Sequence, residues 1–496
     1  MTNDSLKERT ARGLLWGGLN QGGMQVMNLV FGIVLGRLLT PDDYGLIGEL
    51  AIFSLLANSI QDSGFAVALT NKRDATHLDY NSVFWFNIAV SLLLYVALFL
   101  AAPLIAAFYR EPQLTPLARY LFFAFVVASF SIVPRNLLFK QLRQKELALM
   151  AFIALLVSGC VGVGMAWAGL AYWGLATQTL TFNLCVSLLS WRLSGWRPSR
   201  QVSLRPIREM VGFSSKMLAT NICIHLNNNL FTMVFGRLYG KETTGLYNQA
   251  SKWNTMGCQF VSGMVQGVAQ PTFVQVGDDA ERLRRAFRKM LRYTSLIAFP
   301  LLYGLALVAP EFISLTVGPG WLPSAGLMQV LCVGGAAMPL ATLYSNFVIS
   351  RGRSSVYLWN VVSQGLLLLG LVVVCRHTSL AQVLHTWGLP LSRTPVEVMV
   401  WGYTLLLYLW LFVWHFFVWR EIRLSPWAAL ADVLPYLGCA ALVMGFTHWA
   451  TLPIASPCLL FPARVALAAV LYVGLLWLLG AQTLREAAEY LRGVKS

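Results

Sequence analysis

Charged residues are scarce in this sequence. They make up 12% of its 496 residues, about half of the roughly 25% that is usual in soluble globular domains. Acidic residues are the rarer class, with 21 Asp and Glu against 37 Lys and Arg. So little charge, together with 57% hydrophobic residues and a mean hydropathy of +0.62, argues against a soluble protein and places the chain in a lipid bilayer.

The sequence also lacks the usual marks of an enzyme or a metalloprotein. Its eight cysteines include no CxxC pair and nearly all fall in apolar segments, where cysteine behaves as a small hydrophobic residue. It contains no nucleotide-binding P-loop, no cluster of metal-ligand residues and no acidic pair in a loop. We therefore expect a protein that is not an enzyme and that carries no resident cofactor.

Long apolar runs fill most of the chain. A helix needs about 20 mostly apolar residues to cross the hydrocarbon core, whereas β-barrel strands are about 10 residues long and alternate in polarity. We therefore predict an all-α integral membrane protein with connections too short to fold alone. Its fourteen spans lie near residues 14–38, 45–69, 82–107, 117–139, 148–168, 171–191, 209–236, 244–270, 293–316, 322–349, 356–375, 396–419, 430–450 and 460–480.

Lys and Arg are distributed unevenly over the connections. If the N-terminus is cytoplasmic, cytoplasmic segments hold 27 of them and the opposite side holds 8, with Arg464 counted on the outer side. This bias predicts that both termini are cytoplasmic. The net charge of +16 then indicates contact with anionic lipids and no nucleic-acid binding. Segment 278–292 has an apolar edge and six cations, which predicts a helix lying on the cytoplasmic membrane surface.

One motif is present twice, 200 positions apart. Residues 31–46 read FGIVLGRLLTPDDYGL and residues 231–246 read FTMVFGRLYGKETTGL. Counted from Asn28 and Asn228, 8 of 19 positions are identical without a gap. Six spans precede the second copy, so both copies enter the membrane in the same direction. Such a parallel repeat predicts two lobes related by a pseudo-twofold axis along the membrane normal.

The repeat defines the expected domains. We predict an N-terminal six-helix lobe at 1–205, a C-terminal six-helix lobe at 206–425, and two extra spans with a cytoplasmic tail at 426–496. Within the motif, Thr40 can cap the next helix and Pro41 suits its first position. The motif therefore predicts a tight helical hairpin at the outer face.

Three stretches together carry a family resemblance: GRLLTPDDYGL at 36–46, IQDSGFAVAL at 60–69 and VPRNLLFKQLRQK at 133–145. With them the chain resembles polysaccharide exporters and O-antigen flippases of the multidrug/oligosaccharidyl-lipid/polysaccharide exporter superfamily, most closely the colanic-acid-exporter type. The resemblance implies a bacterial inner-membrane protein with a cavity lined mainly by spans 1, 2, 7 and 8. It also implies a substrate made of an oligosaccharide on a polyprenyl diphosphate.

Polar residues lie in the same four spans. In span 8 they recur at spacings of 4, 3, 4, 3 and 4 from Asn248 to Gln266, which places them on one helical face. Such a stripe needs water or a polar ligand beside it, and the alternative is hydrogen bonding between helices. The candidate cavity residues are Lys216, Lys252, Asn248, Thr255, Gln259, Gln21, Gln25, Asn28, Asn227 and Asn228.

Two acidic residues in span 2, Glu49 and Asp62, are candidates for coupling transport to a gradient of H⁺ or Na⁺. Charges inside a membrane are costly and are functional candidates by default. The two lie about 220° apart on an ideal helix, so they face one site only if the helix bends.

These features favour a flippase that moves lipid-linked oligosaccharide units by alternating access, for the synthesis of capsule, exopolysaccharide or O-antigen. We expect a monomer, with a polysaccharide polymerase and co-polymerase as candidate partners. One alternative is a drug/cation antiporter of the same superfamily, against which the cavity lysines argue. The other is a membrane glycosyltransferase or polymerase, which usually needs a sizeable outer loop with catalytic groups.

Overall fold

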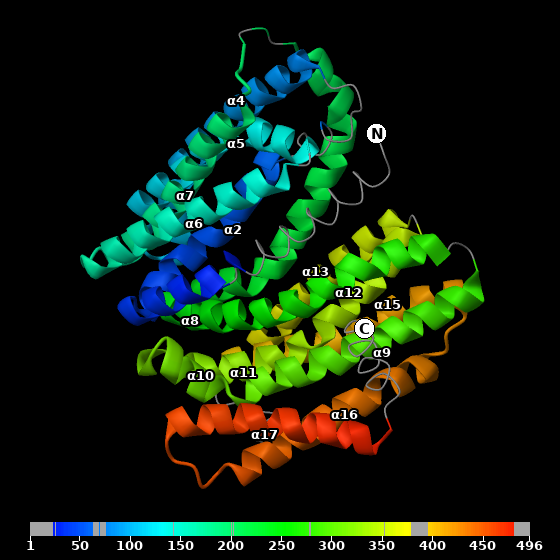
Figure 1. Ribbon diagram of the computed structural model, residues 1–496. Coiled ribbons are helices and arrows are strands. Elements are labelled where there is room, and N and C mark those ends of the chain that lie inside the picture. The colour runs from blue at the N-terminus through cyan, green and yellow to red at the C-terminus, as the bar shows by residue number, and fades with distance from the viewer. Residues whose placement is uncertain are drawn as a thin grey trace. The chain divides into compact units, whose positions relative to one another are not determined.

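The computed structural model is helical throughout the part of the chain that it describes (Figure 1). This part is residues 23–480 without 25, 63–68, 70–75, 142, 200, 202, 277–278, 352 and 378–394. Within it, nine helices are long and apolar enough to cross a membrane, and Val26–Leu38 is a shorter apolar helix. The described parts of the fourteen predicted spans are helical, interrupted at Val308 and Ala336, so the all-α membrane fold is confirmed.

The chain divides into two compact units, Met1–Gly245 and Leu246–Ser496. Unit 1 contains α2 to α7, and α5 packs on α4 and on α7 while α6 packs on α7. Its core is apolar and includes Leu50, Leu117 and Phe122, which are fully buried. The helices are α2 (Pro41–Asp62), α4 (His77–Tyr109), α5 (Leu114–Lys140), α6 (Gln144–Trp167) and α7 (Ala171–Ser194).

Side chains define where the helices of unit 1 begin. Thr40 Oγ1 accepts a hydrogen bond from the Asp43 amide at 3.4 Å, and the Thr40 amide donates to Asp43 Oδ2 at 2.9 Å. This capping box confirms the cap predicted from the repeated motif. Thr76 and Asp79 form the same arrangement at the start of α4.

The α8 helix (Arg205–Val276) contains predicted spans 7 and 8. Its backbone is not helical at Gly240, where φ is +84°, a conformation that glycine adopts without steric cost. The compact units divide five residues later, at Gly245, and not at the predicted boundary of 205. The residues before the kink are assigned to unit 1 because the segment around Gly236 packs against α2 and α4.

Unit 2 contains the end of α8 and the helices after it. Its central helix is α9 (Ala280–Leu307), which contacts α11, α12, α15, α16 and α17. The remaining elements are α10 (Ala309–Thr316), η1 (Pro319–Trp321), α11 (Pro323–Gly335), α12 (Ala337–Ser350), α13 (Ser354–His377), α15 (Pro395–Ile422), α16 (Pro426–Ala450) and α17 (Pro457–Leu478). Thus the two extra helices, expected as a separate region at 426–496, are part of unit 2.

The predicted surface helix at 278–292 is wrong in its placement. From Ala280 onward it is the first part of the continuous helix α9. Its apolar edge, which we expected to enter lipid, is buried in the protein. Phe287 is fully buried, and its ring centroid lies 5.0 Å from that of Tyr344 and 5.5 Å from that of Phe347. The same amphipathic pattern therefore serves helix packing.

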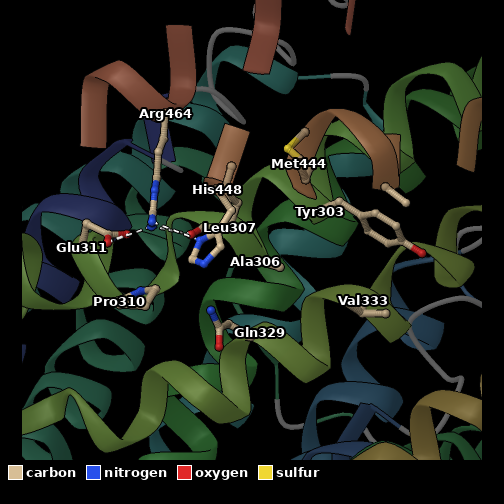
Figure 2. Close-up of a pocket in the computed structure, with 11 residues that line it drawn as sticks. Tyr303, Ala306, Leu307, Pro310, Glu311, Gln329, Val333, Met444, His448 and Arg464 are labelled. Carbon is tan, nitrogen blue, oxygen red and sulfur yellow. Dashed lines mark hydrogen bonds and ion pairs between the residues drawn. The ribbon is translucent and has the colours of Figure 1, made fainter. Parts of the chain in front are cut away.

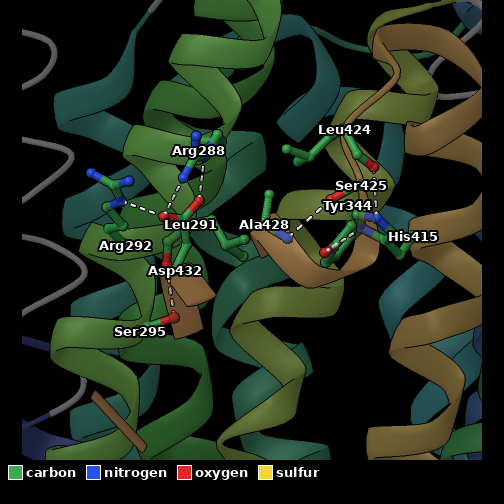
Figure 3. Close-up of polar contacts among 10 residues, drawn as sticks. All are labelled: Arg288, Leu291, Arg292, Ser295, Tyr344, His415, Leu424, Ser425, Ala428 and Asp432. Carbon is green, nitrogen blue, oxygen red and sulfur yellow. Dashed lines mark hydrogen bonds and ion pairs between the residues drawn. The ribbon is translucent and has the colours of Figure 1, made fainter. Parts of the chain in front are cut away.

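Two of the six cations of this segment, Arg288 and Arg292, bind α16 (Figure 3). Asp432 on α16 is 3% exposed and accepts hydrogen bonds from Arg288 Nε at 2.6 Å, Arg288 Nη2 at 3.0 Å and Arg292 Nε at 2.6 Å. A carboxylate shared by two guanidinium groups is a charge-assisted contact of the stronger kind. It attaches one end of the extra helix pair to α9.

Candidate translocation site

The part of α8 that lies in unit 2 has one buried and one exposed face. Trp253, Cys258 and Val261 are buried among the helices of unit 2, whereas Thr255 and Gln259 are exposed. These two positions and Gln266 are the exposed members of the six-residue polar stripe predicted in span 8, so unit 2 leaves part of that stripe uncovered. Asn248 is partly buried and has a polar or electrostatic contact.

Lys252 is the charged member of this stripe. Its Nζ lies 5.3 Å from the ring centroid of Trp253, within the range of a cation–π contact. Among the residues that the structure describes, Lys252 forms no ion pair. Lys252 is partly buried beside this ring, so its ammonium would be stabilised by pairing with an anionic ligand.

The other cavity candidates are described in part. Asn28 and Asn228 are exposed and Asn227 is partly buried, and their place in the cavity stays a prediction. Gln21 and Gln25, and the side chains of Lys216 and Asp62, lie outside the described residues, and their roles stay predictions.

Glu49 on α2 is fully buried, and among the described residues neither of its carboxylate oxygens has a hydrogen-bond partner. The Tyr109 hydroxyl at the end of α4 is likewise buried, and it has no hydrogen-bond partner in the described part of the chain. Gly236 lies against both residues. A β-carbon at this glycine would lie 2.9 Å from Glu49 Cγ and 2.8 Å from Tyr109 Cε1. A buried, unpaired carboxylate is costly, so this environment favours the neutral, protonated acid.

The two copies of the repeated motif contact each other, and on α2 the contact involves residues that precede Glu49. A β-carbon on Gly45 would lie 1.9 Å from the Lys241 carbonyl oxygen, and one on Gly245 would lie 1.9 Å from the Pro41 carbonyl oxygen. Positions 41 and 241, like 45 and 245, correspond in the repeat, so the contact is reciprocal. We call these four residues the hairpin crossing. Only glycine permits so close a backbone approach.

A small charge cluster borders the hairpin crossing. Lys241 Nζ lies 3.4 Å from Glu111 Oε2 and 3.6 Å from Asp42 Oδ2. Burial lowers the pKa of the Lys241 ammonium and the two carboxylates raise it, and the net effect is a raised pKa. Lys241 is therefore a fixed positive charge at the end of the hairpin.

Unit 2 contains a cavity that the sequence did not reveal (Figure 2). Its volume is about 440 Å³, and α9, α10, α11, α16 and α17 line it. Arg464 on α17, 5% exposed, donates to Glu311 Oε1 at 2.9 Å and to the Leu307 carbonyl at 3.2 Å. It also donates to Thr451 Oγ1 and His448 Nδ1, each at 3.1 Å. The sequence predicted Arg464 in an outer connection. This prediction is wrong, because Arg464 is buried within α17.

A signal for this pair exists in the sequence. Arg464 and Glu311 are isolated charges within apolar segments, and such charges are usually paired. No motif links them, however, because they are 153 positions apart.

The family model for polysaccharide biosynthesis proteins matches residues 34–326, which is more than half of the chain. The chain belongs to the polysaccharide biosynthesis protein family. It is 28% identical over 378 residues to the lipopolysaccharide biosynthesis protein WzxC of Escherichia coli (strain K12), covering 74% of this chain and 76% of that relative. It is 27% identical over 373 residues to the teichuronic acid biosynthesis protein TuaB of Bacillus subtilis (strain 168), covering 74% and 76%.

The fold of this family member is similar to that of the lipid II flippase MurJ in an inward closed conformation. The TM-score is 0.72, at 11% sequence identity, and the match covers 93% of this chain and 97% of MurJ. At this identity the likeness establishes the fold, and it extends over nearly the whole chain. The predicted membership of a polysaccharide-synthesis family and the predicted two-lobe membrane fold are therefore confirmed.

Proposed function

We propose that this protein translocates oligosaccharides linked to polyprenyl diphosphate across a bacterial inner membrane, from the cytoplasmic to the outer leaflet. Family membership supports a role in polysaccharide synthesis. WzxC and TuaB are named for the synthesis of two different polymers, and MurJ is named a lipid II flippase. No bond is made or broken in this process, so the protein acts as a transporter and not as an enzyme.

One observation carries the proposal: the polar face of α8, on which Thr255 and Gln259 are exposed and Lys252 is partly buried. A diphosphate and a chain of sugars must leave water, and their desolvation is costly unless polar groups replace it. Lys252 supplies positive charge for the diphosphate, while Thr255 and Gln259 supply hydrogen bonds for sugar hydroxyls. A pump for cationic drugs would be hindered by this charge, so the antiporter alternative is not favoured.

Removal of the Lys252 charge is expected to block transport of the lipid-linked substrate. Lys252→Met keeps a long apolar stem but removes the ammonium. The loss of one charge-assisted contact of about 1.5–3 kcal/mol corresponds to a reduction of the transport rate by roughly 10- to 100-fold. Lys252→Arg should retain much of the activity because the charge remains. The measurement is accumulation of lipid-linked oligosaccharide in the inner leaflet of cells that carry only the variant.

Gln266, further along the same face, offers a neutral comparison, since Gln266→Ala leaves the charge intact and should cause less accumulation than Lys252→Met. If Lys252→Met cells export polymer at the normal rate, Lys252 does not bind the substrate. Normal export by cells that lack the protein would overturn the proposed function itself. Efflux of cationic dyes by the wild-type protein would favour the antiporter.

We further propose that Glu49 couples transport to an ion gradient. Its buried carboxyl has two oxygens without hydrogen-bond partners among the described residues, and Gly236 packs against both this side chain and the Tyr109 ring. This setting suits a proton more than Na⁺, because a bound Na⁺ needs several oxygen ligands at once. Asp62 stays the second candidate. Polysaccharide polymerase and co-polymerase remain the proposed partners, and both termini are proposed to be cytoplasmic.

In proteoliposomes, Glu49→Gln is expected to abolish the stimulation of transport by a pH gradient while slow gradient-independent transport continues. The amide has the shape of the protonated acid but cannot release a proton. Asp62→Asn and an imposed Na⁺ gradient are tested in parallel. Equal stimulation of wild type and Glu49→Gln by a pH gradient excludes Glu49 as the coupling acid, and stimulation by Na⁺ alone excludes proton coupling.

A further inference from the structure

The cavity of unit 2 combines a polar end and an apolar wall (Figure 2). Its polar end is formed by Glu311, Arg464, His448 and Gln329. Its apolar wall includes Ala306, Val333, Ala441 and Met444. A volume of about 440 Å³ lies in the range of small-ligand sites, roughly 300–1,000 Å³. An amphipathic cavity of this kind suits an amphipathic ligand.

At the polar end, some hydrogen-bond donors and acceptors remain available for a ligand. Glu311 is 9% exposed, and no residue that the structure describes forms a hydrogen bond with its buried Oε2, although Oε1 binds Arg464. Arg464 uses four of its five N–H groups on the contacts described above, which leaves one on Nη2. His448 accepts from Arg464 through Nδ1, so its neutral ring carries the proton on Nε2. The site therefore offers one strong acceptor and separate donors.

The charges at the polar end restrict the chemical class of the ligand further. Arg464 and Glu311 cancel each other, so a ligand with no net charge is favoured over an anion. Glu311 Oε2 requires a donor, and the remaining Arg464 and His448 N–H groups suit a phosphate. A zwitterion with an ammonium and a phosphate satisfies both requirements, whereas a choline head group has no N–H to donate.

The surroundings place this site beside lipid. On α16 the residues next to the cavity expose large apolar side chains, with Leu442 71%, Phe446 51% and Trp449 67% exposed. Exposed tryptophans gather at the membrane–water interface, and Trp449 directly follows His448. The polar end is thus at head-group depth, on the side of the membrane predicted to be the outer one.

We propose that this cavity binds one phospholipid with a primary amine, of the phosphatidylethanolamine class, from the adjacent leaflet. The ammonium donates to Glu311 Oε2, the phosphate accepts from Arg464 and His448, and an acyl chain begins along Ala306, Val333 and Met444. The lipid joins α16 and α17 to α9 and α11, and no residue of the proposed translocation site on α8 lines its cavity.

The test is native mass spectrometry of the delipidated full-length protein with dioleoyl-phosphatidylethanolamine, dioleoyl-phosphatidylcholine and dioleoyl-phosphatidylglycerol. We expect one ethanolamine lipid to bind about tenfold more tightly than the choline lipid, as expected for one hydrogen bond to a charged group. Glu311→Gln, which replaces the free acceptor with a donor, should remove this preference. Glu281→Gln, an exposed acid in the same unit, should retain it.

Ala441→Trp provides a second variant if Glu311→Gln fails to fold. Ala441 is exposed at the cavity rim, so a large side chain there fills the cavity without disturbing the Arg464 pair, and binding should be lost. Equal affinity for ethanolamine and choline lipids, a preference for the glycerol lipid, or an unchanged preference in folded Glu311→Gln or Ala441→Trp overturns the proposal. The assay contains no oligosaccharide and no transport step, so its outcome is independent of the proposed function.

Discussion

Replacement of Gly45 with alanine is expected to abolish transport while the polypeptide is still inserted in the membrane. The new β-carbon would lie 1.9 Å from the Lys241 carbonyl oxygen, which is backbone and cannot rotate away. Overpacking typically costs 1–3 kcal/mol and occasionally more, and overlap with backbone belongs at the upper end. A cost of about 3 kcal/mol lowers the population of molecules in which the hairpin crossing is formed roughly 100-fold.

The repeat supplies an internal check on this prediction. Gly245→Ala introduces the same 1.9 Å overlap, with the Pro41 carbonyl oxygen, so the two single variants should be equally impaired. Gly164→Ala in α6 is the control, since a β-carbon there meets no atom within 4 Å; it should transport normally because alanine favours a helix over glycine. Transport and thermal denaturation in detergent are measured for all three. Normal transport by Gly45→Ala would show that the hairpin crossing has no role in function.

Much of this fold was predictable because its signals are local. Apolar runs of helical length identified the fourteen spans, and the Thr40 capping box follows from residues three positions apart. The polar stripe of α8 depends only on helical periodicity, and Thr255 and Gln259 are exposed as that periodicity requires. In each case the residues that determine the structure lie within a few turns of one another.

The errors concern contacts between distant segments. Segment 278–292 has the composition of a surface helix, but whether lipid or protein covers its apolar edge depends on Tyr344 and Phe347. The duplicated Gly45 and Gly245 were recognised as part of a hairpin, whereas their contact with each other's copy depends on how the two hairpins meet. Periodicity identifies a buried face but does not identify its partner.

Intramembrane charges offered a way to find one such partner. Asp432 is the one acidic residue in predicted span 13, 430–450, and a charge in that position needs a partner of opposite sign. Segment 278–292, with its six cations, was the richest source of such partners. Once the two are paired, the segment can no longer lie separately on the membrane surface.

Loss of the Asp432 carboxylate is expected to detach α16 from α9. Removing one member of a buried ion pair typically costs 3–5 kcal/mol. The side chains of Arg288 and Arg292 are 36% and 34% exposed, while the side chain of Asp432 is 2% exposed. Water can therefore solvate the freed cations, and the low end of this range, about 3 kcal/mol, applies. Asp432→Ala should therefore lower the thermal denaturation midpoint clearly, and Asp432→Asn, which keeps an acceptor, should do so less.

The matched control is the Glu281–Arg284 pair on the same helix, whose N–O distance of 2.5 Å is shorter than either Asp432 contact. Both of its side chains are exposed, at 67% and 38%, and exposed pairs contribute about 0–1 kcal/mol. Glu281→Ala should therefore have little effect on the denaturation midpoint, because burial and not distance decides the contribution of an ion pair.

The detachment of α16 is measured by labelling of Cys439, a buried free thiol on α16. In Asp432→Ala, Cys439 should react with maleimide faster than in the wild type, while the buried Cys332 on α11 should react at the wild-type rate. Unchanged labelling of Cys439 together with an unchanged thermal denaturation midpoint would mean that apolar packing alone holds α16 on α9.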